Sequence, residues 1–156
     1  ATGCTPMVKD YRHLLRDDEQ YAQRAQRISA MTKDLSEVLR REDLSELCPN
    51  TSKRIAFHSP CSLQHAQNLD GVGESLLKQA GFKLVAVRDA HLCCGSAGTY
   101  SILQPALSTQ LRDNKLDCLQ EKQPDLIATA NIGCLLHLQA KAEAPVIHWI
   151  ELLASG

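Results

Sequence analysis

The stretch Arg54-Ile55-Ala56-Phe57-His58-Ser59-Pro60-Cys61 holds the pattern that decides the fold. A short apolar run ends abruptly at a serine and a proline, which is typical of a buried β-strand followed by a loop. A cysteine comes three residues after the end of the predicted strand. The same order of buried strand, loop and cysteine recurs twice further along the chain.

Three more short apolar runs follow, and segments with helical spacing separate them. These runs cover residues 82–87, 125–130 and 145–148. Before the second run, Val72, Leu76 and Ala80 lie on one helix face, and Gly81 suits the position just past a helix end. Further helices are expected after Pro105, near Gly133 and over residues 149–154.

The alternation of strands and helices predicts the fold class. Parallel strands need helical crossovers between them, and strands covered on both faces are apolar throughout rather than alternating. The sequence therefore predicts an α/β fold in which a parallel four-stranded sheet is flanked by helices.

A helical segment is expected before the sheet. Tyr21, Ala25, Ile28 and Thr32 have the spacing of one helix face, and residues 48–52 have the composition of a linker. We therefore divide the chain into a helical segment over residues 1–50 and an α/β domain over residues 51–156. Because the chain begins without methionine or a signal peptide, we expect it to be a fragment of a longer protein.

Composition places the chain among soluble globular proteins. It has 156 residues, of which 44% are hydrophobic and 22% are charged, and its formal net charge is −1. Its basic residues are scattered and matched by acids, which argues against a nucleic-acid partner. Seven cysteines without an export signal favour reduced thiols in the cytosol, and no apolar run approaches the ~20 residues that span a bilayer.

Four cysteines fall just beyond predicted strands. Cys61 follows the first strand, the adjacent Cys93 and Cys94 follow the second, and Cys134 follows the third. Neighbouring cysteines are poor disulfide partners, and the carboxyl edge of an open α/β sheet is where ligands bind. Four thiols from three loops at that edge favour a metal site over simple packing.

The residues themselves leave the metal open. Four thiolates suit tetrahedral zinc or an iron–sulfur cluster. Zinc sites often show short paired spacings, whereas 31 residues lie between Cys61 and Cys93 and 39 between Cys94 and Cys134. This dispersal favours a cluster. A zinc module that docks partner subunits, or thiol–disulfide chemistry at Cys93 and Cys94, are the alternatives.

Several histidines and glycines accompany these cysteines. His137 lies one helical turn after Cys134 and could be a further ligand or a hydrogen-bond donor beside the ligands. The other histidines that could play either role are His58, His65 and His91. Glycines are expected to shape the loops, because they allow tight turns and close approaches. The glycines concerned are Gly95, Gly98 and Gly133.

These motifs resemble the cysteine-rich CCG domain of heterodisulfide reductase B-type subunits and their relatives. Within that group, the likeness is greatest to the iron–sulfur subunits of glycolate oxidases (glycolate dehydrogenases). It covers essentially the whole chain, and one departure is His137, where many CCG domains have a cysteine. The segments that carry it are Ala56-Phe57-His58-Ser59-Pro60-Cys61, His91-Leu92-Cys93-Cys94-Gly95, Leu111-Arg112-Asp113-Asn114-Lys115, Thr129-Ala130-Asn131-Ile132-Gly133-Cys134 and His148-Trp149-Ile150-Glu151.

The resemblance implies an electron-transfer role. It implies that Cys61, Cys93, Cys94 and Cys134 hold an iron–sulfur cluster of the 4Fe-4S type, which oxygen exposure would be expected to empty. It further implies a flavin-containing partner subunit that oxidises glycolate, a membrane quinone as acceptor, and a cytoplasmic complex at the inner face of the membrane. Residues 51–156 would be the C-terminal CCG domain, and Cys4 an orphaned ligand of a preceding repeat. The chain alone is not expected to be catalytic.

Overall fold

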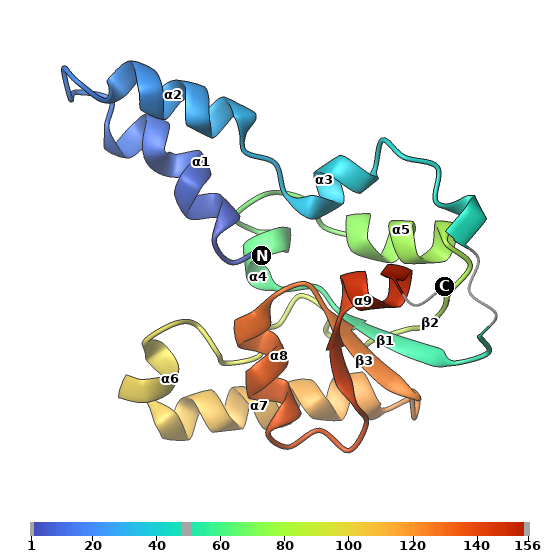
Figure 1. Cartoon of the computed structure of the whole chain (residues 1–156). Helices are drawn as coiled ribbons and strands as arrows, with labels where there is room; N and C mark the ends of the chain where they lie inside the picture. Colours follow the sequence, from blue (N-terminus) through green and yellow to red (C-terminus); the bar gives the residue numbers. More distant parts are fainter. Residues whose placement is uncertain (1, 48–50, 155–156) are drawn as a thin grey trace.

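A parallel four-stranded sheet forms the centre of the molecule in the computed structural model, which describes residues 2–47 and 51–154 (Figure 1). The strand order is β2-β1-β3-β4, and each neighbouring pair is parallel. The predicted α/β class and four-stranded parallel sheet are therefore confirmed. The strands are β1 (Arg54–His58), β2 (Lys83–Val85), β3 (Leu126–Thr129) and β4 (Val146–His148).

Helices cover both faces of the sheet. Apolar side chains of α5 and α9 pack on one face together with Ile55 and Phe57, and those of α7 and α8 pack on the other together with Ala56. Successive residues of a strand point to opposite faces, so burial of both faces requires the unbroken apolar run of β1. These helices are α5 (Val72–Gln79), α7 (Pro105–Gln120), α8 (Ile132–Gln139) and α9 (Trp149–Ala154).

The second strand is shorter than the apolar run 82–87 predicts. Phe82 is held at the end of α5, where its amide donates to the carbonyl oxygen of Leu77 at 2.9 Å. Gly81 has the expected left-handed backbone there, with a φ of 87°. β2 lies at the sheet edge and pairs with β1 alone, so only residues 83–85 meet a partner strand.

The N-terminal segment forms a helical hairpin beside the sheet domain (Figure 1). The hairpin comprises α1 (Thr5–Leu14) and α2 (Ala22–Met31), followed by the short α3 (Leu35–Leu39). Of the predicted apolar face, Ala25 is buried but Ile28 is 50% exposed. The linker predicted over residues 48–52 falls largely on residues 48–50, which lie outside the described residues.

Three short helices complete the described part of the chain. They are the 3₁₀ helix η1 (Ser45–Leu47), α4 (Cys61–Gln64) and α6 (Tyr100–Leu103). The longest helix of all, α7, has 16 residues. Within residues 2–47 and 51–154, no helix combines the length and apolar character needed to cross a membrane.

Candidate metal centre

The cysteines after β1, β2 and β3 meet at the carboxyl edge of the sheet. Cys61 begins α4 directly after the first strand, Cys93 and Cys94 lie in the loop after the second, and Cys134 lies in the first turn of α8. In Figure 1, α4 and the start of α8 lie at the same end of the sheet. The topology thus brings residues that are distant in sequence to one edge, as expected for parallel strands.

The four sulfurs form a chain of contacts, which we call the cysteine cluster. The thiols of Cys61 and Cys93 share a hydrogen bond, as do those of Cys93 and Cys94, and those of Cys94 and Cys134. Cys61 is exposed, Cys93 is half-buried, and the other two are buried. The cluster therefore runs from the protein surface into the packed face between α7 and α8.

Proton sharing polarises the cluster. The hydrogen bond with Cys93 raises the pKa of Cys61, and the same bond lowers the pKa of Cys93. Deeper in the cluster, the hydrogen bond between Cys94 and Cys134 raises the pKa of the first and lowers that of Cys134 to about 5. In each of these two pairs, the cysteine with the lowered pKa is therefore the one that more readily becomes a thiolate. Thiolates are the form of cysteine that binds soft metals.

His58 points its ring into the same place. It is the last residue of β1, it is 1% exposed, and neither ring nitrogen has a nitrogen or oxygen partner within the described residues. The group beside the ring is the thiol of Cys134, whose pKa the ring helps to lower. A ring nitrogen of His58 and the sulfurs of Cys94 and Cys134 all lie within 4.8 Å of one another. Two buried thiols and a buried imidazole form a donor set that fits a metal.

Other buried polar atoms near these strand ends also lack partners in the described parts of the chain. They are the hydroxyl oxygens of Ser59, which follows β1, and of Thr129, which ends β3 beside His58. Leaving a buried polar group unpaired costs about 1–3 kcal/mol. Their gathering at one edge of the sheet is the pattern expected where a bound group completes the site.

Two side chains hold the loop after β2 against the rest of the site. The amide of Gln64 donates to the carbonyl oxygens of Ser59, at 2.5 Å, and of Ala90, at 3.2 Å. The ammonium of Lys115 donates to Asp89, at 3.0 Å, and to Ala90, at 2.9 Å. These bonds fix the backbone that leads into Cys93 and Cys94.

The glycine after the paired cysteines is required by close packing. Gly95 has a φ of 87°, and a Cβ added there would lie 2.3 Å from the carbonyl oxygen of Ser108. The hydroxyl of Ser108 donates to the carbonyl oxygen of Gly95 at 2.8 Å. The backbone of Cys93-Cys94-Gly95 can therefore approach α7 this closely only because the third residue is glycine.

The loop after β3 is tied to the start of α4. The Asn131 side-chain oxygen accepts from the Gly133 amide at 2.9 Å and so caps α8. Its side-chain nitrogen donates to the hydroxyl of Ser62 at 3.2 Å. One side chain thus couples the segments that carry Cys61 and Cys134. Gly133 itself is tightly packed, because an added Cβ would lie 2.9 Å from the Ser96 hydroxyl oxygen.

Among the described residues, the remaining predicted residues do not join the group of donor atoms formed by His58, Cys94 and Cys134. His137 contacts Ser108, with its Nε2 atom 3.2 Å from the hydroxyl and 3.3 Å from the carbonyl oxygen. It thereby supports the residue that braces Gly95. His65 and His91 are exposed. Gly98 adopts the left-handed region with a φ of 58°, and an added Cβ there would meet nothing within 4 Å.

Cys4 lies at the start of the helical hairpin. It is exposed and occupies the N-cap position of α1. Its neighbour Gly3 packs closely on Asn131, whose side-chain nitrogen would lie 2.8 Å from an added Cβ. The N-terminal segment therefore reaches the rim of the site.

Sequence reasoning assigned no role to Gln64, Ser108, Lys115 or Asn131. For Lys115 a signal was present, since it falls between Leu111 and Cys118 on one face of α7 and is 1% exposed. A lysine is almost never fully buried without a partner, so its position on a helix face that packs on the sheet was informative.

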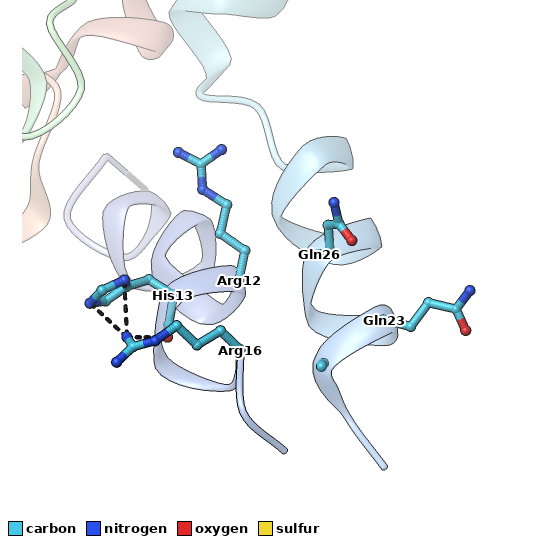
Figure 2. Close-up of a pocket in the computed structure, with 6 residues that line it drawn as sticks. Arg12, His13, Arg16, Gln23 and Gln26 are labelled. Carbon is cyan, nitrogen blue, oxygen red and sulfur yellow. Dashed lines mark hydrogen bonds between the residues drawn. The ribbon is translucent and has the colours of Figure 1, made fainter. Parts of the chain in front are cut away.

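A surface pocket lies elsewhere, between α1 and α2 at the end of the hairpin that points away from α4 (Figure 1). Figure 2 shows the guanidinium of Arg16 against His13, where it donates to the carbonyl oxygen at 3.1 Å. The pocket belongs to the exposed hairpin and not to the cysteine cluster. Its lining residues are Arg12, His13, Arg16, Ala22, Gln23 and Gln26.

Comparison with known proteins agrees with this geometry. The chain is 48% identical over 153 residues to the glycolate oxidase iron-sulfur subunit of Escherichia coli. The aligned residues cover 98% of this chain and 38% of that protein. It is 32% identical over 141 residues to lactate utilization protein A of Geobacillus thermodenitrificans. Here the aligned residues cover 87% of this chain and 58% of that protein. The chain thus spans less than two thirds of either relative. The family model for the cysteine-rich domain CCG matches residues 55–139, which include the whole cysteine cluster, and the chain belongs to this family.

Proposed function

We propose that Cys61, Cys93, Cys94 and Cys134 hold an iron–sulfur cluster through which electrons pass. The observation that carries this proposal is the continuous chain of thiol contacts that links three separate loops. Cysteine thiolates are the usual ligands of such clusters. One relative is named a glycolate oxidase iron-sulfur subunit, and the other is named a lactate utilization protein.

A cluster suits this donor set better than a single zinc ion. Of the four sulfurs, only those of Cys94 and Cys134 belong to the group of donor atoms that lie within 4.8 Å of one another, so a centre larger than one ion is needed to bind the full set. When bound, the cluster supplies reversible one-electron chemistry. We propose a cluster of the 4Fe-4S type. A structural zinc site that docks partner subunits is the competing function, because His58, Cys94 and Cys134 alone could hold one ion.

The protein's own residues would set the properties of the centre. Burial of Cys94 and Cys134 excludes water from its inner side, and the buried ammonium of Lys115 supplies a positive charge close to the anionic thiolates. Hydrogen bonds, charge and solvent exposure are the factors that tune cluster potentials. Since Cys61 is the exposed end, a redox partner would approach from that side.

The proposed biological role is electron relay during oxidation of a short 2-hydroxy acid. Support comes from the relatives' names, which refer to glycolate and lactate, two acids of this class. A flavin-containing subunit of the same complex would oxidise glycolate to glyoxylate, and this protein would carry the electrons one at a time towards a membrane quinone. The complex would lie in the cytoplasm at the inner face of the membrane.

The helical segment over residues 1–50 would belong to a preceding CCG repeat. Support comes from a similarity between two helix starts: Gly3-Cys4 leads into α1, and Gly133-Cys134 lies in the first turn of α8. Cys4 would then be the counterpart of Cys134, with its partner cysteines in the preceding repeat. Residues 51–156 would form the C-terminal CCG domain.

A matched pair of cysteine variants tests the cluster assignment. Cys134 and Cys118 are both buried, 5% and 6% exposed, but only Cys134 belongs to the cysteine cluster. Iron, acid-labile sulfide and zinc are measured after reconstitution without oxygen. We expect Cys134→Ser to lose iron and sulfide while Cys118→Ser retains both. Stoichiometric zinc without sulfide in the unmodified protein would establish the zinc alternative instead.

A further inference from the structure

The feature that leads beyond the four cysteines is the buried imidazole of His58. We propose that His58 is a nitrogen ligand of the same metal centre, beside the sulfurs of Cys94 and Cys134. This inference rests on the proposed function, because it names a further ligand of that cluster. The centre would then have mixed sulfur and nitrogen ligation.

The backbone position of His58 suits a ligand better than that of the other nearby histidines. It ends β1 in the middle of the sheet and lies beside Thr129 of β3 in the parallel register. A strand between two neighbours is rigid, so the ring is held in place without help from the loops. His65 and His91 instead lie in exposed positions after the strands.

The ring nitrogens of His58 lack any other use. Both are buried, and in the described part of the chain neither has a nitrogen or oxygen partner; the group beside the ring is the thiol of Cys134, a member of the cysteine cluster. A neutral imidazole carries one donor and one acceptor, and buried groups of this kind are normally satisfied. A metal bond satisfies the acceptor nitrogen. An imidazole that merely filled space would be expected to have a carbonyl or hydroxyl partner in the structure.

The distances fit ligands of one metal centre. Ligand bonds of about 2.0–2.3 Å mean that two atoms on the same ion are at most about 4.6 Å apart. The His58 nitrogen and the sulfurs of Cys94 and Cys134 already lie within 4.8 Å of one another. Donor atoms this close to one another can bind one metal centre, including neighbouring irons of a cluster. They come from β1, the loop after β2, and α8, so the sheet and its two neighbouring connections define the site.

Nitrogen ligation has a consequence for redox behaviour. A neutral imidazole adds no negative charge where a cysteine thiolate would add one, so the reduced cluster is stabilised. Replacement of cysteine by histidine in iron–sulfur proteins raises the potential for this reason. His58 would therefore make the centre easier to reduce than a cluster with sulfur ligands alone.

Pulsed EPR with isotope-labelled histidine tests the assignment directly. The protein is purified without oxygen in natural-abundance and ¹⁵N-histidine forms, reduced, and examined for hyperfine coupling to a bound nitrogen. We expect the coupling to change with the isotope, to disappear in His58→Cys, and to persist in the exposed control His91→Ala. His58→Cys should keep iron because it supplies a sulfur ligand, and its reduction potential should become more negative. His58→Ala should release iron to a chelator at least about tenfold faster.

The outcomes separate this inference from the proposed function. A cluster with full iron and sulfide but no coupled histidine nitrogen would refute His58 ligation and leave the four-cysteine assignment standing. Coupling that persists in His58→Cys would also refute it. Absence of iron and sulfide from the unmodified protein would overturn both proposals. Circular dichroism of each variant shows whether the fold is kept, and His58→Cys provides a decision if His58→Ala does not fold.

Discussion

The ammonium nitrogen of Lys115 lies 2.9 Å from the carbonyl oxygen of Ala90, inside a protein region where the lysine is 1% exposed. The same nitrogen donates to the carbonyl oxygen of Asp89 at 3.0 Å. Burial lowers the pKa of this lysine, and nearby cysteines oppose that effect. Lys115, a buried residue of α7, thus holds the backbone that leads to Cys93 and Cys94.

Replacement of this lysine should weaken both the fold and the centre. We expect Lys115→Met to lower the free energy of unfolding by about 1–3 kcal/mol, because two backbone carbonyls lose their donor. Loss of the positive charge should also make the cluster's reduction potential more negative. The control is Lys141→Met, which breaks an exposed ion pair with Asp113 and should cost no more than about 1 kcal/mol. Denaturant unfolding and a redox titration measure the two effects. Equal behaviour of both variants would contradict this role.

The two glycines after the cysteines should differ sharply in their tolerance of alanine. Both have left-handed backbones, so each substitution carries a conformational cost of about 1–2 kcal/mol. Gly95→Ala should cost a further ~1–3 kcal/mol, because the new Cβ meets the Ser108 carbonyl, whereas Gly98→Ala meets nothing. Thermal unfolding and iron content compare the variants. Similar losses from both would show that the contact between Gly95 and α7 is not required.

The bond between Asn131 and Ser62 should couple two loops energetically. Asn131→Ala removes the cap of α8 and should destabilise the protein by about 0.5–2 kcal/mol. Ser62→Ala removes only the bond between the loops. In a double-mutant cycle we expect a coupling energy of about 0.5–1.5 kcal/mol. Strictly additive effects on unfolding would mean that Asn131 acts through the helix cap alone.

The free energy of unfolding should depend on pH through Asp34, which lies between the helical hairpin and the α/β domain. Burial raises the pKa of this carboxyl, but bonds from Ser36, Gln67 and Thr2 outweigh that effect and hold it below its ordinary value of 3.8. A carboxyl with a lowered folded-state pKa stabilises the fold above the unfolded value, and this contribution disappears as the pH falls through the folded value.

The test for Asp34 compares the free energy of unfolding of the variants at neutral pH and at acidic pH. Asp34→Ala should cost about 1–2 kcal/mol at neutral pH, and the difference from the unmodified protein should shrink as the pH falls below about 4. Asp117→Asn, an exposed change on α7, should leave the unfolding midpoint nearly unchanged. A cost for Asp34→Ala that stays constant down to acidic pH would rule out the charged carboxylate as its source.

Much of the fold was predictable because apolar residues have different sequence spacings in buried strands and in helices. The apolar run 54–58 could only be a covered strand, and Gly81 marked a helix end correctly. The extent of β2 was not predictable, because its length depends on how far β1 runs beside it. The exposed Ile28 was also missed, since spacing shows which residues share a face but not what covers that face.

The site was predictable only in part, for a related reason. The positions of the four cysteines after strands placed them at one edge, because parallel topology aligns strand ends. Which histidine would join them depended on side-chain directions. Adjacent positions in β1 point to opposite faces, and only the structure shows that His58 shares its face with Cys94 and Cys134. His137, one helical turn from Cys134, instead supports Ser108.

A reductive titration of the anaerobically reconstituted protein, followed by visible absorption with iron and sulfide analysis, tests the central claim most directly. We expect a broad visible absorption that is bleached by reductant, returns on reoxidation, and accompanies matched amounts of iron and acid-labile sulfide. A colourless protein that contains zinc, or iron that is bound without sulfide and undergoes no reversible change, would contradict it.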